Sequence, residues 1–194
     1  MALTHLLYLH GFRSSPQSTK ARRMAAEVQA RWPQLHWWCP QLPPSPEAAA
    51  RLIWEGTRDW PCQGMAVIGS SLGGFYATWL AAQRSCTLVV LNPAVAPARD
   101  LARHIGEQST WQQPDERFFF EPRFVDELRA LQASTGALPE RCLAVIAQGD
   151  EVLDWREMQA RYAQAHLRIV QGSDHALSDF ELHLPAILDF LAER

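Results

Sequence analysis

Residues 65–75 read Met-Ala-Val-Ile-Gly-Ser-Ser-Leu-Gly-Gly-Phe, and this stretch decides the expected fold. The apolar run before Gly69 predicts a buried strand, and the segment after Ser71 has a helical pattern that begins without a linker. Glycines two residues before and two residues after Ser71 leave room for a sharp turn between the two elements. The stretch therefore predicts a strand, a tight turn that carries Ser71, and a helix.

The G-x-S-x-G pattern around Ser71 is typical of a serine that a strained turn presents as a nucleophile. Such a turn lifts the hydroxyl clear of the sheet and places it at a helix N-terminus, where backbone amides favour developing negative charge. The alternative is a glycine-rich turn in another parallel-sheet protein, for example one that holds a phosphate. The motif alone leaves both interpretations open. A catalytic serine also needs an oxyanion donor, an acid and a histidine.

The composition is that of an ordinary globular protein. The chain has 194 residues, of which 47% are hydrophobic and 20% are charged. This length fits one domain, residues 1–194, with a substantial core. The formal net charge of −3 provides no basic field for nucleic acid or an anionic membrane. We therefore expect neither nucleic acid nor a membrane as a partner.

The cysteines and the first residues indicate a cellular compartment. The four cysteines lie at 39, 62, 86 and 142, with no C-x-x-C spacing, and three of them fall at the ends of predicted strands. The first ten residues lack a basic leader and run directly into a strand, so no signal peptide is predicted. No apolar run has the length needed to span a bilayer. We expect a soluble, reduced, cytoplasmic protein.

Strand-like and helix-like segments alternate along most of the chain. The predicted strands are 3–9, 35–39, 65–69, 87–91, 142–147 and 167–170, and the predicted helices are 18–32, 46–59, 72–84, 155–165 and 179–192. Ser18 and Ser45 are suited to cap the first two helices. Nearly continuous apolar strands joined by helices predict an α/β fold with a mainly parallel sheet covered on both faces.

One region breaks this alternation. About fifty residues separate Leu91 from Cys142, far more than a strand-to-helix crossover needs. They include Trp111 and the run Phe118-Phe119-Phe120. The plain interpretation is an irregular excursion with one or two helices packed on the sheet edge. The functional interpretation, which we favour, is a cap or lid at about 97–140 that supplies an acyl pocket, with Trp111 and Phe119 contacting substrate.

The loop after the first predicted strand reads His10-Gly11-Phe12-Arg13. In parallel α/β sheets, reacting groups lie on loops at the carboxyl ends of the strands. A tight His-Gly turn there lets the Phe12 amide point toward Ser71, with the Leu72 amide as the second oxyanion donor. His10 itself is a weaker candidate for the catalytic base, and a structural role suits it better. Residues expected to contact substrate are His10, Gly11, Arg13, Ser70, Trp111 and Phe119.

The remaining partners of Ser71 follow the last two predicted strands. Asp150 comes soon after the strand 142–147 and is well placed to orient an imidazole. Asp154 is the reserve acid, although it is better suited to cap the next helix, and Glu151 is expected to face away. His175 lies in a short polar loop after the last strand, free to reach the serine. The chain order Ser71, Asp150, His175 is the order found in α/β-hydrolases.

With these motifs in place, the chain resembles α/β-hydrolases over its whole length, and more narrowly the small bacterial YqiA-like esterases. The stretches that carry the resemblance are 6–12, 14–16, 40–44, 67–74, 91–95 and 149–154. The resemblance implies a serine esterase with Ser71, Asp150 and His175 as its triad. It also implies a central elbow strand and the loss of an N-terminal antiparallel strand pair. It fades between residues 99 and 141, where the substrate pocket would be shaped.

The sequence thus predicts an esterase for short-to-medium acyl esters that needs no metal or organic cofactor, since the histidines show no metal-ligand spacing. An acyl-CoA-type thioesterase with the same triad is the first alternative, in which Arg13 would hold an anionic group. A non-catalytic binding protein on the same fold is the second. The oligomeric state is left open, because Trp37, Trp38, Trp54 and Trp60 suit either a dimer face or the core.

Overall fold

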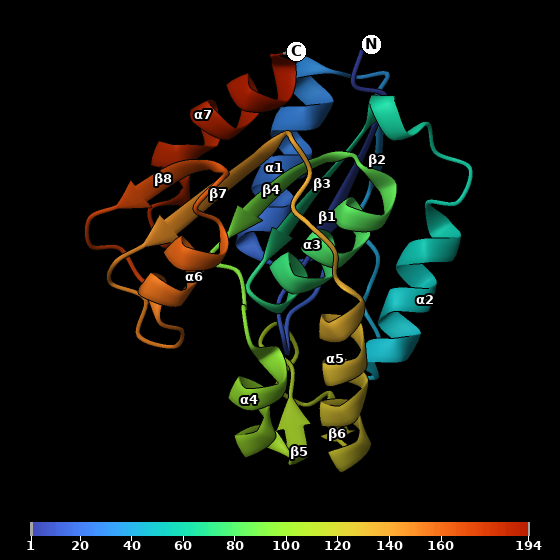
Figure 1. Ribbon diagram of the computed structural model, residues 1–194, viewed down its shortest axis with the longest axis vertical. Helices are drawn as coiled ribbons and strands as arrows, with labels where there is room; N and C mark the ends of the chain where they lie inside the picture. Colours follow the sequence, from blue (N-terminus) through green and yellow to red (C-terminus); the bar gives the residue numbers. More distant parts are fainter. Residues whose placement is uncertain (1, 194) are drawn as a thin grey trace.

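A six-stranded sheet lies at the centre of the computed structural model, which describes residues 2–193 (Figure 1). Its strand order is β2-β1-β3-β4-β7-β8, and every neighbouring pair is parallel. The strands are β1 (His5–Leu9), β2 (His36–Trp38), β3 (Met65–Ser70), β4 (Thr87–Leu91), β7 (Cys142–Ala147) and β8 (His166–Val170). The expected α/β-hydrolase topology is confirmed, with the strand that precedes Ser71 near the middle of the sheet.

Helices cover both faces of the sheet. On one face lie α1 (Thr19–Arg31) and α7 (Phe180–Ala192). On the other lie α2 (Pro46–Gly56), α3 (Leu72–Arg84) and α6 (Trp155–Arg161). The central strands serve both layers by alternation: Met65 and Val67 of β3 pack on the second face, and Ala66 and Ile68 on the first. This two-sided burial explains why the strands read as continuous apolar runs.

The ends of the helices follow local chemistry. The Ser18 and Ser45 hydroxyls accept hydrogen bonds from backbone amides in the first turns of α1 and α2, which confirms both predicted caps. The structure ends α2 at Gly56 and α6 at Arg161, three and four residues earlier than predicted. A side chain at position 56 would collide with the Trp38 ring, so the close approach of α2 to β2 requires glycine at this end of the helix.

The segment between β4 and β7 contains more regular structure than expected. It forms α4 (Pro97–Leu101), a short 3₁₀ turn η2 (Ala102–His104), the antiparallel strands β5 (Gly106–Ser109) and β6 (Arg117–Phe120), and α5 (Pro122–Ser134). The sequence predicted one or two helices here and no hairpin. Figure 1 shows α4, the hairpin and α5 below the sheet, at the end where its parallel strands terminate. A second 3₁₀ turn, η1 (Cys62–Gly64), precedes β3.

Most of the tryptophans proposed for a dimer face are used in packing. Trp37 lies against Tyr8 with ring centroids 5.9 Å apart, and Trp38 and Trp60 pack edge to face at 6.0 Å. Trp54 is the exposed member of the four, at 39%. Among residues 2–193 no helix is both long enough and apolar enough to cross a membrane.

The buried cysteines are inert thiols. Cys86 directly precedes β4 and Cys142 begins β7, and both are buried as predicted. Burial raises the pKa of each thiol to about 12, so neither is a thiolate at neutral pH. Cys39, after β2, is only partly buried.

Candidate active site

Ser71 occupies a strained turn between β3 and α3. Its backbone has φ 55° and ψ −121°, outside the regions that non-glycine residues favour, at a cost of roughly 1–3 kcal/mol. Hydrogen bonds fix the turn, because the Ser71 amide donates to the Leu91 carbonyl and its carbonyl accepts from the Ala94 amide, both at 3.0 Å. A side chain on Gly69 would strike the Gly73 backbone, and one on Gly73 would strike the Leu9 carbonyl. Both glycines are therefore required by close approach.

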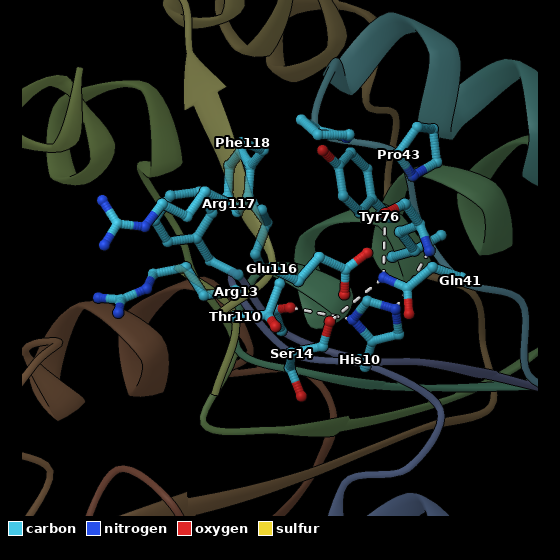
Figure 2. A pocket seen from close by; sticks show the side chains of 15 residues that line it. His10, Arg13, Ser14, Gln41, Pro43, Tyr76, Thr110, Glu116, Arg117 and Phe118 are labelled. Carbon is cyan, nitrogen blue, oxygen red and sulfur yellow. Dashed lines mark hydrogen bonds between the residues drawn. The ribbon is translucent and has the colours of Figure 1, made fainter. Parts of the chain in front are cut away.

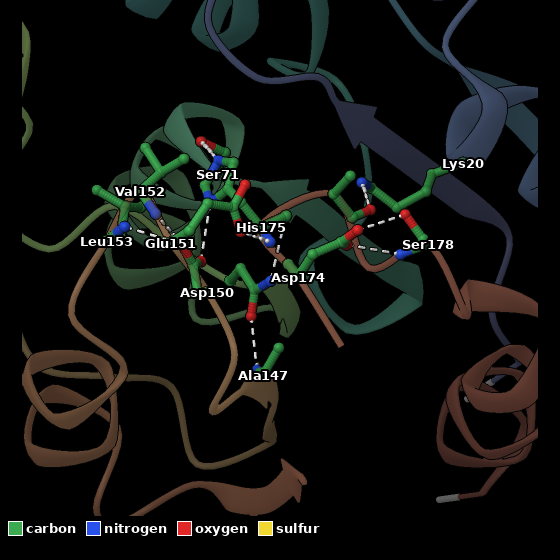
Figure 3. A network of polar contacts seen from close by, with 12 residues as sticks. Lys20, Ser71, Ala147, Asp150, Glu151, Val152, Leu153, Asp174, His175 and Ser178 are labelled. Carbon is green, nitrogen blue, oxygen red and sulfur yellow. Dashed lines mark hydrogen bonds and ion pairs between the residues drawn. The ribbon is translucent and has the colours of Figure 1, made fainter. Parts of the chain in front are cut away.

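Three polar side chains far apart in the sequence meet at this turn. The His175 Nε2 lies 3.0 Å from the Ser71 hydroxyl oxygen, and its Nδ1 lies 2.7 Å from the Asp150 Oδ2. Figure 3 shows the imidazole between the serine and the carboxylate. The reserve acid Asp154 accepts instead from the Arg156 amide at 2.9 Å and caps α6. Of the two acids considered, the one beside the imidazole is Asp150.

The Asp150 carboxylate is held from two sides. Its Oδ1 accepts from the amides of Val152 (2.9 Å) and Leu153 (2.8 Å), which leaves Oδ2 for the imidazole. The side chain is fully buried. An ionised acid at Oδ2 favours a proton on the His175 Nδ1, so Nε2 is left to accept from the Ser71 hydroxyl. This tautomer has the geometry that taking a proton from a serine requires.

A buried asparagine connects the histidine loop to the sheet. Asn92 directly follows β4, is completely buried, and accepts from the Ala147 amide at 2.8 Å through Oδ1. Its Nδ2 donates to the carbonyls of Asp174 (2.9 Å) and His175 (3.1 Å). No role for Asn92 was predicted from the sequence. A polar residue directly after a buried strand, at the edge where the other site residues lie, was the signal available.

Two more side chains hold the same loop. The Glu151 Oε2 accepts from the His175 amide at 3.0 Å, so the expectation that Glu151 faces away was wrong. It bends back because the turn after β7 is closed by the Asp150 carboxylate. On the other side, the Lys20 ammonium of α1 donates to the Ala176 carbonyl. Asn92, Glu151 and Lys20 therefore hold consecutive residues of the loop, as Figure 3 shows for Glu151 and Lys20.

Two backbone amides beside Ser71 are free to receive an oxyanion. Gly11 lies against the serine, since a Cβ at Gly11 would be 3.6 Å from the Ser71 hydroxyl oxygen. The amides of Phe12 and Leu72 follow Gly11 and Ser71, and within residues 2–193 neither donates to a backbone carbonyl outside the regular elements. Both residues line the same cavity. Their placement agrees with the two-amide arrangement expected from the sequence.

His10 supports this turn. Its Nε2 accepts from the Leu42 amide at 3.1 Å, so the other nitrogen carries the proton and donates to the Gly11 carbonyl at 3.0 Å. Burial lowers the pKa of His10, which keeps the imidazole neutral. With both nitrogens occupied, His10 has the structural role that the sequence analysis preferred.

A cavity of about 330 Å³ opens beside the oxyanion amides (Figure 2). One wall comes from the loops after β1 and β2, and another from Thr110, Glu116, Arg117 and Phe118 of the β5–β6 hairpin. Of the six residues expected to contact substrate, His10, Gly11 and Arg13 line this cavity, and Ser70, Trp111 and Phe119 do not. Ser70 is buried in the sheet, behind the nucleophile.

The alternation of β6 explains why Phe119, expected from the sequence to contact substrate, lies outside the cavity. Phe120 is 1% exposed and Phe118 partly buried, because both rings pack on Phe12 at centroid distances of 5.3 and 5.9 Å. Phe119, between them, points outward and is 58% exposed. The three phenylalanines are indistinguishable until the strand is recognised.

Trp111 packs on the Arg13 guanidinium and lies outside the cavity. The Arg13 guanidinium donates to the Ser109 carbonyl at 2.6 Å and to its hydroxyl at 3.0 Å, and it lies 4.1 Å from the centre of the Trp111 ring. Trp111 is 63% exposed on the outer side of this contact. Arg13 thus lines the cavity while its charged end is directed away from it, as Figure 2 shows, so the expected anion-binding role has no support.

The fold and this arrangement of side chains define the class: the chain has the α/β-hydrolase fold. It belongs to the uncharacterised protein family UPF0227, whose model matches residues 5–192, and the resemblance stated from the sequence is thereby confirmed. No group of three or more His, Cys, Asp or Glu residues between 2 and 193 is arranged to hold a metal ion.

Solved structures agree on the fold. A structure reported for the metagenome-derived lipolytic enzymes LipS and LipT has a TM-score of 0.73 at 18% identity, covering 98% of this chain and 94% of that one. A putative hydrolase from Agrobacterium vitis S4 reaches 0.77 at 17%, covering 97% and 88%. Est1E from Butyrivibrio proteoclasticus reaches 0.71 at 15%, covering 99% and 90%. At these identities the likeness establishes the fold alone.

Proposed function

We propose that this protein is a serine esterase that hydrolyses short-to-medium acyl carboxylic esters through an acyl-enzyme. The observation that carries the proposal is the hydrogen-bonded series Ser71–His175–Asp150, at 3.0 and 2.7 Å. The strained turn at Ser71 argues against a non-catalytic binding protein, because packing alone does not require a backbone conformation that costs free energy.

The first half-reaction transfers the acyl group to the enzyme. The Ser71 oxygen attacks the ester carbonyl while the His175 Nε2 takes the hydroxyl proton. The Phe12 and Leu72 amides donate hydrogen bonds to the resulting oxyanion. In enzymes, removal of one such donor raises the activation free energy by about 3–4 kcal/mol. Asp150 stabilises the imidazolium, which then gives its proton to the departing alcohol. The products are the alcohol and an acyl-serine.

The second half-reaction returns the free enzyme. Water attacks the acyl-serine carbonyl as His175 accepts one of its protons, and the same two amides again face the oxyanion. When the tetrahedral intermediate collapses, the proton moves from His175 to the Ser71 oxygen. The carboxylic acid leaves, and no metal or organic cofactor enters either step.

The cavity supports short acyl groups. Its volume of about 330 Å³ lies at the small end of the range for ligand pockets. The β5–β6 hairpin contributes one wall, which supports a role for the segment 97–140 as a cap that shapes the acyl site. No observation favours an acyl-CoA thioester over an ester, since the Arg13 guanidinium is occupied by Ser109.

Steady-state assays with p-nitrophenyl butyrate and butyryl-CoA test the proposal. We expect turnover of the ester with a higher kcat/KM than the thioester. We expect Ser71→Ala to lower kcat by at least about 10³-fold. Ser134→Ala, an exposed serine of α5, is the matched control and should retain full activity. Equal activity of Ser71→Ala and the control would overturn the mechanism. A strong preference for butyryl-CoA would show that the protein is a thioesterase and not an esterase.

A further inference from the structure

A buried hydroxyl group in the cavity has no role in the proposed chemistry. Tyr76 lies on α3, four residues after the oxyanion residue Leu72, so the two share one face of the helix. Side chains on a helix lean toward its N-terminus, which directs the Tyr76 ring toward the Ser71 end. Figure 2 shows the Tyr76 hydroxyl pointing into the cavity, on the side toward Phe118.

Within residues 2–193 the Tyr76 hydroxyl forms no hydrogen bond with a protein group, although the residue is only 2% exposed. Its oxygen is reached from the cavity, since the one fully enclosed side-chain atom without a partner among these residues is the Tyr8 hydroxyl. Tyr162, another buried tyrosine, bonds to the Thr78 hydroxyl at 2.7 Å. The hydrogen bond of Tyr76 is therefore completed by a group in the cavity, which is water in the free protein and a polar group of the ligand in the complex.

The hydroxyl is a neutral donor. Burial raises the pKa of Tyr76, and the nearby Glu127 carboxylate raises it further. The phenol therefore stays protonated over the whole range in which an esterase works. It can donate one hydrogen bond and accept another, but it offers no charge to an anionic ligand.

A second polar group faces the same space from the opposite wall. Glu116, directly before β6, lines the cavity, and Figure 2 shows its carboxylate directed inward rather than toward Arg13 or Arg117. A carboxylate accepts hydrogen bonds and disfavours a second negative charge. The lining also includes the apolar residues Leu42, Pro43 and Phe118 and the polar residues Gln41 and Thr110. A hydroxyl on the ligand can accept from Tyr76, and a hydroxyl that reaches the other wall can donate to Glu116.

We propose that Tyr76 is a specificity-determining residue that makes the site prefer acyl esters with a hydroxyl a few bonds from the scissile carbonyl. The inference rests on the proposed function, because the position of the carbonyl is set by the Leu72 amide. Four helical residues advance about 6 Å along the axis, and the Tyr76 side chain leans back over this turn. That reach suits a hydroxyl at carbon 3 of the acyl chain.

The test compares substrates that differ by one group. p-Nitrophenyl 3-hydroxybutyrate, as each enantiomer, and p-nitrophenyl 3-methylbutyrate have the same shape, with a hydroxyl in one where the other has a methyl. For the better enantiomer we expect the wild-type kcat/KM to exceed that of the methyl ester by roughly 3- to 10-fold, the effect of one neutral hydrogen bond. Tyr76→Phe should bring this ratio to about 1 through loss on the hydroxy ester alone.

Two further variants make the result decisive. Tyr162→Phe deletes a buried hydroxyl away from this cavity and should keep the wild-type ratio. Glu116→Gln, an exposed change that does not threaten the fold, should lower the ratio and so tests the proposal even if Tyr76→Phe were unstable.

The outcomes separate this inference from the esterase proposal. Equal turnover of the two esters by the wild type, or an unchanged ratio in folded Tyr76→Phe, overturns the inference and leaves the esterase standing. Equal loss on both esters in Tyr76→Phe shows a structural role and also overturns it. Absence of turnover on either ester contradicts the esterase itself, and the inference with it.

Discussion

At the scale of single residues, Asn92 connects the loop that carries His175 to the sheet. All three hydrogen bonds of its side chain are internal, one to the end of β7 and two to this loop. The amide nitrogen supplies both donors to the loop, and no water competes because the residue is fully buried. Asn92 is therefore a positioning residue: it acts on the reaction through the place of the imidazole.

We predict that Asn92→Asp lowers kcat while changing KM little. The substitution keeps the acceptor for the Ala147 amide but turns a second oxygen toward two carbonyls, which displaces the histidine loop. A displacement of about 1 Å of a catalytic group costs on the order of 100-fold in rate. Steady-state kinetics measures the split between kcat and KM. Glu151→Gln, which keeps an accepting oxygen for the His175 amide, should lose less than about 3-fold.

If the folded Asn92→Asp variant had the kcat of the wild type, Asn92 would not be a positioning residue for His175. If the lower kcat were accompanied by a lower free energy of unfolding, and the pH profile of kcat were unaltered, Asn92 would have a role in stability alone.

His10 gives a pH dependence to stability. Burial lowers its pKa below the 6.5 of a free imidazole, so the unfolded chain takes up this proton more readily than the folded protein. The stability linked to His10 is fully present above pH 6.5 and is lost as the pH falls toward the lower pKa of the folded state. We predict a loss of up to about 1.4 kcal/mol per pH unit in that window.

Urea unfolding at several pH values between 7 and 5 measures this slope. In His10→Gln the carboxamide can still accept from Leu42 and donate to Gly11, but it does not titrate in this range. The variant should show a smaller slope than the wild type. His5 and His104, whose pKa values are also lowered by burial, contribute equally to both proteins. Identical slopes would contradict the assignment.

At the scale of elements, the β5–β6 hairpin is attached to the oxyanion loop by two contacts. The Phe12 ring packs against Phe118 and Phe120, while the next residue, Arg13, binds Ser109. Phe12 directly follows Gly11, which lies beside Ser71, and its ring packs on the hairpin. Movement of the hairpin is therefore coupled to the oxyanion loop.

We predict that Arg13→Lys loosens the hairpin without unfolding the protein. A lysine cannot reproduce the two donors in a planar fork or the stacking on Trp111. Hydrogen–deuterium exchange of amides in 106–120 should accelerate by roughly 10-fold, the loss of one charge-assisted hydrogen bond, while exchange in α3 stays unchanged. The control is Arg117→Lys on the same hairpin, whose exposed pair with Glu107 contributes little. Equal protection in both variants would show that Arg13 does not hold the hairpin.

The hairpin also marks the limit of prediction from the sequence. Strand β5 reads Gly-Glu-Gln-Ser, with no apolar alternation, and β6 is a run of three phenylalanines after Arg117. Neither has the two-residue period that identifies a half-buried strand. The pairing depends on Phe12 and Arg13, about a hundred residues earlier, which no local pattern reveals. For this reason Trp111 and Phe119, which the sequence suggested as substrate contacts, lie outside the cavity.

At the scale of the whole molecule, the parallel sheet gathers the chemistry at one edge. Ser71 and His175 are separated by 104 positions, yet each follows a strand of the same sheet, as does Asp150. The fold and these three residues were predictable, because buried strands are recognised by their apolar runs and the motif lies where a strand ends. Asn92 and Glu151 follow strands too, but their roles depend on loop conformations that no residue pattern indicates.

Labelling with a fluorophosphonate tests most directly whether Ser71 is an activated nucleophile. Incubation of the native protein followed by peptide mapping in a mass spectrometer should show one adduct, on Ser71, and His175→Ala should react far more slowly. No adduct on Ser71 in the folded protein, or a reaction just as fast without the imidazole, would contradict the account.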